Sequence, residues 1–171
     1  MGPLWIGPSC EPRPEDAVAV VIDPGRAFGT GSHPTTRLCL DFLVGLPPGS
    51  LLDLGCGSGV ISVAAAKLGF GPVIAVDHDE AAVEAARRNA AANGVAVDVR
   101  VASVLDGNLP PADVGIANID LSSVDALGPL LDVRTLVTAG YFHSRRPAIA
   151  GYRHAERRID GGWAADRFVR E

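Results

Sequence analysis

The order of apolar and polar positions along the middle of the chain predicts a parallel β-sheet whose strands are joined by helices. Short apolar runs rich in β-branched residues alternate with Ala-rich stretches of helical periodicity, which is the order of βαβ units. Strands in such a sheet are nearly continuous apolar runs, because both faces of the sheet are covered. The expected strands are residues 51–54, 73–77, 97–101 and 114–118, and the expected helices are residues 60–68 and 80–93.

The two ends of the chain depart from this alternation. A Pro-rich lead-in, residues 2–14, precedes an apolar run at residues 17–22 that predicts a strand. Pro34 is expected to start a helix that continues to Leu43, because the N–H that proline lacks would have no partner at the first helical position. Beyond the central alternation, the pattern predicts a helix over 122–131, a strand near 134–139, a short helical piece around 147–150, and a hairpin of strands 152–159 and 163–169 around Asp160-Gly161-Gly162.

Together these elements predict an α/β fold. The expected architecture is a doubly wound, mainly parallel, Rossmann-like sheet that ends in a C-terminal antiparallel hairpin. We expect residues 1–26 to form an N-terminal lead-in and strand segment, and residues 27–171 to form the functional domain, within one compact unit.

Composition and charge narrow the class of protein. The chain has 171 residues, of which 47% are hydrophobic, so it can bury a substantial core and is not expected to be disordered. Its net charge of −5 argues against a broad basic face, and we expect no direct nucleic-acid binding. No apolar run approaches the ~20 residues of a membrane-spanning helix. Cys10, Cys39 and Cys56 lack zinc-ligand spacing. These features predict a cytoplasmic protein with no membrane association, no metal and no disulfide scaffold.

A glycine-rich loop carries the first functional signal. Gly55-Cys56-Gly57-Ser58-Gly59 follows a predicted strand and opens a helix, where backbone approaches a ligand closely and free helix N–H groups face it. The dinucleotide pattern G-x-G-x-x-G would need a glycine where Val60 stands. Asp77 ends the next strand, at the position of a ribose-binding acid, and Asp53 would repel phosphate but attract an ammonium group. A ligand with a ribose diol is therefore predicted; the competing interpretation is a tight turn followed by a surface aspartate.

These residues resemble a known family. Asp53-Leu-Gly-Cys-Gly-Ser-Gly59, followed by Asp77, resembles the S-adenosylmethionine site of class I methyltransferases. Ala27-Phe-Gly-Thr-Gly-Ser-His-Pro-Thr-Thr36 and Ala117-Asn-Ile119 are similar to signature segments of the ribosomal protein L11 methyltransferases (PrmA type), over nearly the whole chain. The resemblance implies an S-adenosylmethionine-dependent N-methyltransferase that acts on protein amines, either a lysine side chain or an N-terminal amine, with a ribosomal protein as its partner. Residues 27–171 would be the methyltransferase domain; the family's N-terminal substrate-docking domain is expected to be absent, and a partner chain could replace it.

The resemblance also implies a set of cofactor contacts. Thr36 would bind the methionyl carboxylate, with Phe28 and Thr30 in the same pocket; helix capping explains the threonines as well. Further contacts are implied for Asp77 with the ribose hydroxyls, Gly55 and Gly57 through their backbone, Asp53 with the methionyl amine, and Ser103, beside Val104, with the adenine. An ordinary surface turn is the competing interpretation for Ser103.

Asn118 is the implied catalytic residue and is also assigned to the cofactor site. It ends a predicted strand, where open α/β sheets bind their ligands. Its amide oxygen, with the carbonyl of Ile119, would orient an acceptor amine for in-line attack. A turn asparagine at a strand end is the alternative. Asp120 and His143 are candidate proton acceptors, although solvated surface positions explain both, and His33 is expected to be a helix cap.

The departures from the family lie on the acceptor side. Asp120-Leu-Ser-Ser123, the short connection before the last parallel strand, and Tyr141-Phe142-His143 differ from the family pattern. Two alternatives therefore stay open: a methyltransferase for a small molecule or another protein, and a catalytically inactive S-adenosylmethionine-binding protein. A dinucleotide-dependent reductase is disfavoured by Val60 and Asp53.

Overall fold

The computed structural model describes residues 4–12, 14–23 and 31–171. In these residues a seven-stranded sheet has the order β5-β4-β3-β6-β7-β9-β8, and a separate two-stranded sheet pairs β1 (Leu4–Gly7) with β2 (Val18–Val21) in parallel. The strands of the main sheet are β3 (Leu51–Leu54), β4 (Val73–Asp77), β5 (Asp98–Val101), β6 (Ala112–Asn118), β7 (Val133–Phe142), β8 (Tyr152–Asp160) and β9 (Trp163–Arg170). The helices are α1 (Pro34–Val44), α2 (Val60–Lys67), α3 (Glu80–Ala92), α4 (Leu121–Ala126) and a short 3₁₀ turn, η1 (Gly128–Leu130).

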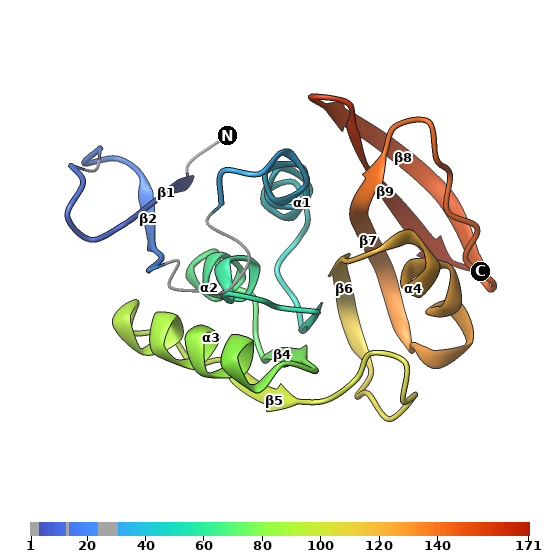
Figure 1. Cartoon of the computed structure of the whole chain (residues 1–171), viewed down its shortest axis with the longest axis horizontal. Coiled ribbons are helices and arrows are strands. Elements are labelled where there is room, and N and C mark those ends of the chain that lie inside the picture. The colour runs from blue at the N-terminus through green and yellow to red at the C-terminus, as the bar shows by residue number, and fades with distance from the viewer. Residues whose placement is uncertain (1–3, 13, 24–30) are drawn as a thin grey trace.

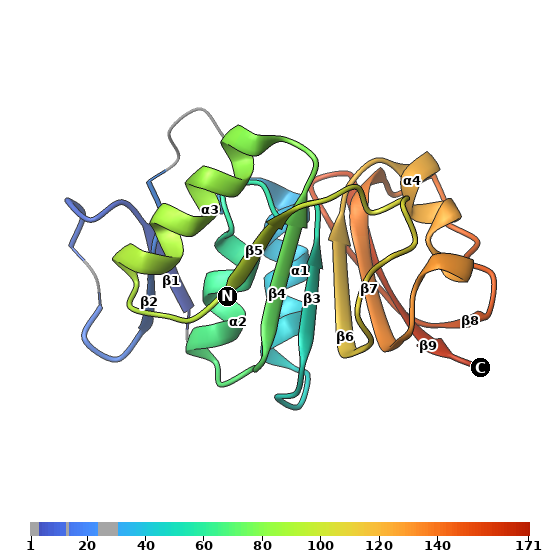
Figure 2. The ribbon, with the colours of Figure 1, turned by 90° about the horizontal axis from the view of Figure 1, so that it is seen from below.

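The order of the strands places a ligand crevice at β3. The chain runs outward from β3 through β4 to β5, then returns to pair β6 with the other side of β3. These pairings are parallel, and Leu54 lies opposite Val76 in β4 and Ala117 in β6. Figure 2 shows β4, β3, β6 and β7 side by side in this order. The carboxyl ends of β3, β4 and β6 therefore meet at the point where a doubly wound sheet binds its ligand.

Helices cover the two faces of the sheet unequally. Figure 1 shows α1, α2 and α3 on one side of the sheet and α4 on the other. On the first side, apolar side chains of α1 and α2 pack with Leu51, Val114 and Val137. On the second side, Val124 of α4 packs with a cluster that includes Leu136. Two apolar layers thus bury the central strands, which explains their unbroken apolar sequences.

The C-terminal strands confirm the predicted hairpin and extend the sheet. β8 and β9 are antiparallel and joined by a tight turn, as expected from Asp160-Gly161-Gly162. The second strand of the hairpin lies next to β7 and the first lies at the edge. A mainly parallel sheet with antiparallel C-terminal strands is therefore confirmed.

Three local predictions differ from the structure. The helix expected over residues 122–131 is wrong, because α4 ends at Ala126 and η1 follows; Pro129 lacks a helical donor, and Gly128 packs so closely on Ala150 that a Cβ would lie 2.3 Å from its carbonyl oxygen. The helical piece around residues 147–150 is absent from the described chain, where this segment is loop. The lead-in contains a strand that was not expected, β1.

In the part of the chain that the structure describes, no helix combines the length and the apolar character needed to cross a bilayer.

Candidate functional site

A cleft of about 350 Å³ opens at the carboxyl ends of the parallel strands. Gly55 follows β3, Asp77 ends β4, Ala102 follows β5 and Ile119 follows β6, so each of the four strands contributes to its wall. The full lining comprises Gly55, Gly57, Asp77, His78, Ala102, Ser103, Val104, Leu105, Ile119, Asp120 and Ser123. The predicted residues Gly55, Gly57, Asp77 and Ser103 are thus brought together, although they come from separate segments of the sequence.

The glycine loop lies close against its neighbours because its residues have no Cβ. Gly55, Gly57 and Gly59 have φ values of 78°, 53° and 79°, in the left-handed region that favours glycine. A Cβ on Gly55 would lie 2.5 Å from Cγ2 of Ile119, and one on Gly59 would lie 2.9 Å from Cβ of Ala86. The loop therefore fits between the end of β6 and helix α3 only with these glycines.

Asp77 connects the glycine loop to the start of the next helix. Its Oδ2 accepts the N–H of Gly57 at 2.9 Å, and its Oδ1 accepts the N–H of Asp79 at 3.0 Å. The residue is 8% exposed and lines the cleft. Each carboxylate oxygen has further acceptor capacity, so the pair suits two vicinal hydroxyl groups.

Asp53 does not line the cleft. Its side chain is buried, and its Oδ2 accepts the hydroxyl of Ser62 in α2 at 2.5 Å. Burial raises the pKa of Asp53 to about 6, although the hydrogen bonds from Ser62 oppose the shift. The predicted contact of Asp53 with a ligand amine stays a prediction.

Asn118 and Thr36 meet beside this cleft. The amide Nδ2 of Asn118 donates to Oγ1 of Thr36 at 3.4 Å, which joins the end of β6 to the first turn of α1. Thr36 is buried, as is Thr35, whose N–H donates to Nδ1 of the N-cap His33 at 3.3 Å. The predicted cap role of His33 is confirmed. Phe28 and Thr30, predicted for the same pocket, lie outside the described residues.

The backbone after Asn118 is held by the neighbouring strand. The N–H of Ile119 donates to the carbonyl of Ala139 in β7 at 3.1 Å. Gly140, which follows Ala139 in β7, lies at an irregularity in the pairing of β7 with β9 and has a positive φ of 107°. Sequence reasoning did not single out Gly140. Its only signal there was a glycine inside an apolar strand pattern, which often marks a close backbone approach.

One of the two candidate proton acceptors is poorly suited to that role. Asp120 is the N-cap of α4; it accepts hydrogen bonds from the hydroxyls of Ser122 and Ser123 and from the N–H of Ser123. These bonds lower the pKa of Asp120 to about 2, which makes its carboxylate a weak base. His143 is exposed in the loop after β7.

The wall opposite the glycine loop is partly apolar. Val104 and Leu105 line the cleft next to Ser103, and the Ser103 hydroxyl accepts the N–H of Leu105 at 3.1 Å. Leu105 is 46% exposed. A planar aromatic ligand group suits such a wall, because apolar side chains gain free energy when a ring covers them.

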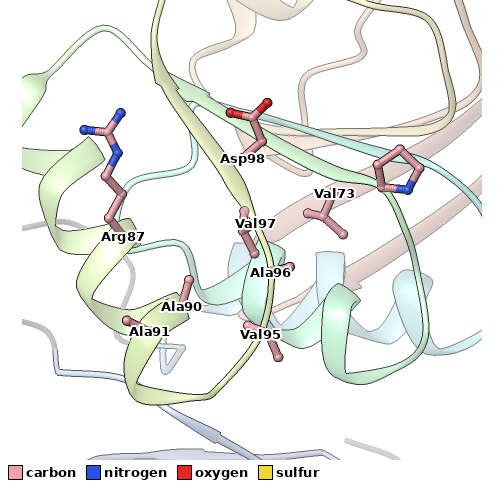
Figure 3. Close-up of a pocket in the computed structure, with 9 residues that line it drawn as sticks. Val73, Arg87, Ala90, Ala91, Val95, Ala96, Val97 and Asp98 are labelled. Carbon is pink, nitrogen blue, oxygen red and sulfur yellow. The ribbon is translucent and has the colours of Figure 1, made fainter.

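A larger hollow of about 520 Å³ lies at the other end of the sheet. It is bordered by Val73, which begins β4, whereas the candidate site is at Asp77, which ends that strand. Figure 3 shows mostly small apolar side chains around it, with Arg87 and Asp98 projecting outward. It lacks the glycine loop and the buried carboxylate of the cleft, so it is not the candidate active site.

The cleft fits S-adenosylmethionine. Gly55 and Gly57 line the cleft without side chains, Asp77 offers two oxygens to ribose hydroxyls, and Val104 and Leu105 form an apolar wall for adenine. This site in a doubly wound sheet defines a class I methyltransferase fold, the class whose methyl donor is S-adenosylmethionine. Residues 1–144 match the family described as Ribosomal protein L11 methyltransferase (PrmA), and the chain belongs to that family.

Relatives and solved structures agree with this assignment. The chain is 42% identical over 168 residues to the ribosomal protein L11 methyltransferase of Vibrio campbellii, covering 92% of this chain and 56% of that protein. It is 48% identical over 133 residues to that of Pseudomonas putida (strain GB-1), covering 75% and 45%. The chain thus spans about half the length of the curated relatives it matches.

Structural similarity supports the same fold. The crystal structure of ribosomal protein L11 methylase from Lactobacillus delbrueckii subsp. bulgaricus has a TM-score of 0.83 and 27% identity, covering 95% of this chain and 91% of that one. The putative methyltransferase yhhF from Escherichia coli shares the fold, with a TM-score of 0.68 at 14% identity, covering 79% and 86%.

Proposed function

We propose that this chain is an S-adenosylmethionine-dependent N-methyltransferase that acts on protein amines, with a ribosomal protein as its substrate. The observation that carries the proposal is the position of Asn118, at the end of β6 next to the cleft and fixed to Thr36 of α1. Membership of the L11 methyltransferase family and the names of the relatives support the choice of substrate.

Each part of the cofactor is assigned to residues that line the cleft or are proposed to lie next to it. Asp77 accepts the ribose hydroxyls, Gly55 and Gly57 present their backbone, and Ser103 with Val104 faces the adenine. Thr36 is proposed for the methionyl carboxylate, together with Phe28 and Thr30, and Asp53 for the methionyl ammonium group. When bound, the cofactor supplies an electrophilic methyl group on a sulfonium sulfur.

Asn118 orients the acceptor. Its amide oxygen and the Ile119 carbonyl are hydrogen-bond acceptors, so they can hold an amine by its N–H groups and direct its lone pair at the methyl group. Neither group titrates, and Asp120, whose pKa is lowered to about 2, is a weak base. The acceptor amine therefore loses its proton to water or to a neighbouring group other than Asp120 before the attack.

The proposal is tested by intact-mass spectrometry. The chain is incubated with deuterated-methyl S-adenosylmethionine and methyl-deficient ribosomal proteins. Label on a ribosomal protein is expected, and Asn118→Ala should abolish it while leaving cofactor affinity largely unchanged. Asn108→Ala, at an exposed asparagine that does not line the cleft, is the matched control. Full transfer by Asn118→Ala would remove Asn118 from the mechanism.

A second candidate function has support on the acceptor side. Phe142 is 58% exposed at the end of β7 and stacks on Trp163 with ring centroids 4.5 Å apart. This aromatic surface departs from the family's pattern, and it favours an acceptor other than the ribosomal protein. A methylation screen of cell extract, separated into proteins and metabolites, discriminates the two functions.

The relatives' greater length bears on target recognition. Because they are about twice as long as the matched region, we propose that target binding draws on a further segment or a partner chain. If the ribosomal proteins stay unlabelled although cofactor binding is confirmed, this requirement or another acceptor explains the result.

A further inference from the structure

Asn89, in helix α3, contacts the glycine loop through a buried hydrogen bond. The residue is 3% exposed, and its Nδ2 donates to the carbonyl of Ser58 at 2.8 Å. Its Oδ1 accepts the N–H of Asp23 at 3.1 Å, and Nδ2 also lies 3.4 Å from the Asp23 carbonyl. One buried amide thus joins three segments of the chain: α3, the glycine loop and the residues that follow β2.

The glycine loop is held at two consecutive residues by the same strand–helix unit. Asp77, at the end of β4, accepts the N–H of Gly57, and Asn89, in the helix that follows, binds the carbonyl of Ser58. Ala86, one turn before Asn89, packs against Gly59, where a Cβ would lie 2.9 Å away. Ser58 itself is fully buried. The orientation of the loop's N–H groups therefore depends on contacts with β4 and α3 as well as on the loop's own glycines.

Asn93 provides an internal comparison. It lies one turn after Asn89, and its amide also binds the N-terminal strand: Oδ1 accepts the N–H of Val21 at 2.9 Å, and Nδ2 donates to the Val21 carbonyl. Its remaining contact is with the carbonyl of Asn89 itself. Asn93 therefore anchors β2 to α3, as Asn89 anchors Asp23, but among the described residues its hydrogen bonds go to Val21 and Asn89 and not to the glycine loop.

We propose that Asn89 is a positioning residue for S-adenosylmethionine. Its side chain holds the Ser58 carbonyl and so keeps the glycine loop in the position in which Gly55 and Gly57 contact the ligand. The inference rests on the proposed function. Losing a buried hydrogen bond costs free energy, and the loop is no longer held at Ser58 by α3. Loss of the Asn89 amide then weakens ligand binding although the residue never touches the ligand.

The test compares variants of the full chain by calorimetric titration with S-adenosylhomocysteine, the product form of the cofactor, which binds without turnover. Asn89→Ala is expected to raise Kd about fivefold to tenfold, the loss of one buried hydrogen bond. Asn89→Asp keeps an oxygen for the Asp23 N–H but lacks the donor to Ser58, and the same rise is expected. Asn93→Ala should leave Kd within about twofold of wild type, although it also releases the N-terminal strand.

Chemical unfolding of each variant separates stability from positioning. Asn89→Ala and Asn93→Ala are expected to lower the midpoint to a similar extent, and titrations are made where both variants are folded. The inference is overturned if Asn89→Asp binds like wild type, or if Asn93→Ala weakens binding as much as Asn89→Ala. Should Asn89→Ala not fold, Asn89→Asp decides the question. If the wild-type chain binds no S-adenosylhomocysteine, the proposed function itself fails.

Discussion

The carbonyl oxygen of Ile119 packs against Gly140 on the side where a Cβ would project. A Cβ built on Gly140 would be 2.0 Å from that oxygen, and also 3.1 Å from the Ile119 nitrogen. Gly140 has a φ of 107°, a conformation that other residues rarely adopt. β7 thus presses its backbone against the residue that follows Asn118, and only a glycine permits that approach.

Replacing this glycine should therefore disable methyl transfer. Gly140→Ala forces Ile119 and with it Asn118 to move, and a displacement of about 1 Å at such a site can cost about 100-fold in turnover. Gly151→Ala is the control, because Gly151 has a similar positive φ of 78° but open space around its Cβ position. Rates per folded molecule, measured with labelled cofactor, check this; equal rates for the two variants would contradict it.

The pKa of Asp53 makes stability depend on pH. Burial raises this pKa to about 6 from its ordinary 3.8, because the folded protein favours the protonated carboxyl. The contribution of Asp53 to the free energy of unfolding is therefore complete below about pH 4 and is lost as pH rises through about 6. A shift of two pKa units corresponds to about 3 kcal/mol. Asp53→Asn does not titrate, so between pH 4 and pH 8 it should gain up to about 3 kcal/mol in unfolding free energy relative to wild type. Urea unfolding at both pH values measures this gain.

Ser62 supplies the control for that experiment. Its hydroxyl donates to Asp53 and lowers the carboxyl pKa, so Ser62→Ala should raise the pKa further and steepen the pH dependence. A parallel pH dependence for wild type and Asp53→Asn would show that another group is responsible.

Asp77 should determine cofactor affinity. Asp77→Asn removes the charge and replaces one acceptor oxygen with a donor, so the Gly57 N–H and the ribose hydroxyls lose a charged partner. A hydrogen bond to a charged group contributes about 1.5–3 kcal/mol, which predicts a Kd for S-adenosylhomocysteine about 10–100-fold higher. Asp79→Asn, at the N-cap of α3, keeps its capping oxygen and should bind as wild type does. Tighter binding of a nicotinamide dinucleotide than of S-adenosylhomocysteine would instead revive the reductase hypothesis.

Thr36 should affect turnover through Asn118. Thr36→Val keeps the shape of the side chain but removes the hydroxyl that accepts the Asn118 amide, so both cofactor affinity and kcat should fall, each about fivefold. Thr35→Val is the control, because Thr35 is as buried as Thr36 but its hydroxyl contacts Nδ1 of His33 at 2.7 Å and not Asn118. That variant should lose stability at the start of α1 while turnover per folded molecule is retained. Similar losses of turnover in both variants would assign Thr36 to helix capping alone.

The chemistry of the candidate site was largely predictable from local sequence. A strand that ends in a glycine loop, a helix, and a second strand that ends in Asp77 form one continuous βαβ unit, so periodicity and turn glycines are enough to place these residues. The sequence could not show that Asp53 is buried and hydrogen-bonded to Ser62 of α2, because the local sequence of a strand-end carboxylate is the same whether it is exposed or buried.

By itself, the sequence determined the order of the central strands and helices, the glycine loop, Asp77 and the family to which the chain belongs, because each depends on residues that are near one another in the chain. Only the tertiary structure showed which side chains and strands from different segments are in contact. Asn118 reaches Thr36, Asn89 reaches Ser58, and β9 enters the sheet between β7 and β8. These contacts join distant segments, and their geometry depends on how helices and sheet pack together, so no local pattern of residues encodes them.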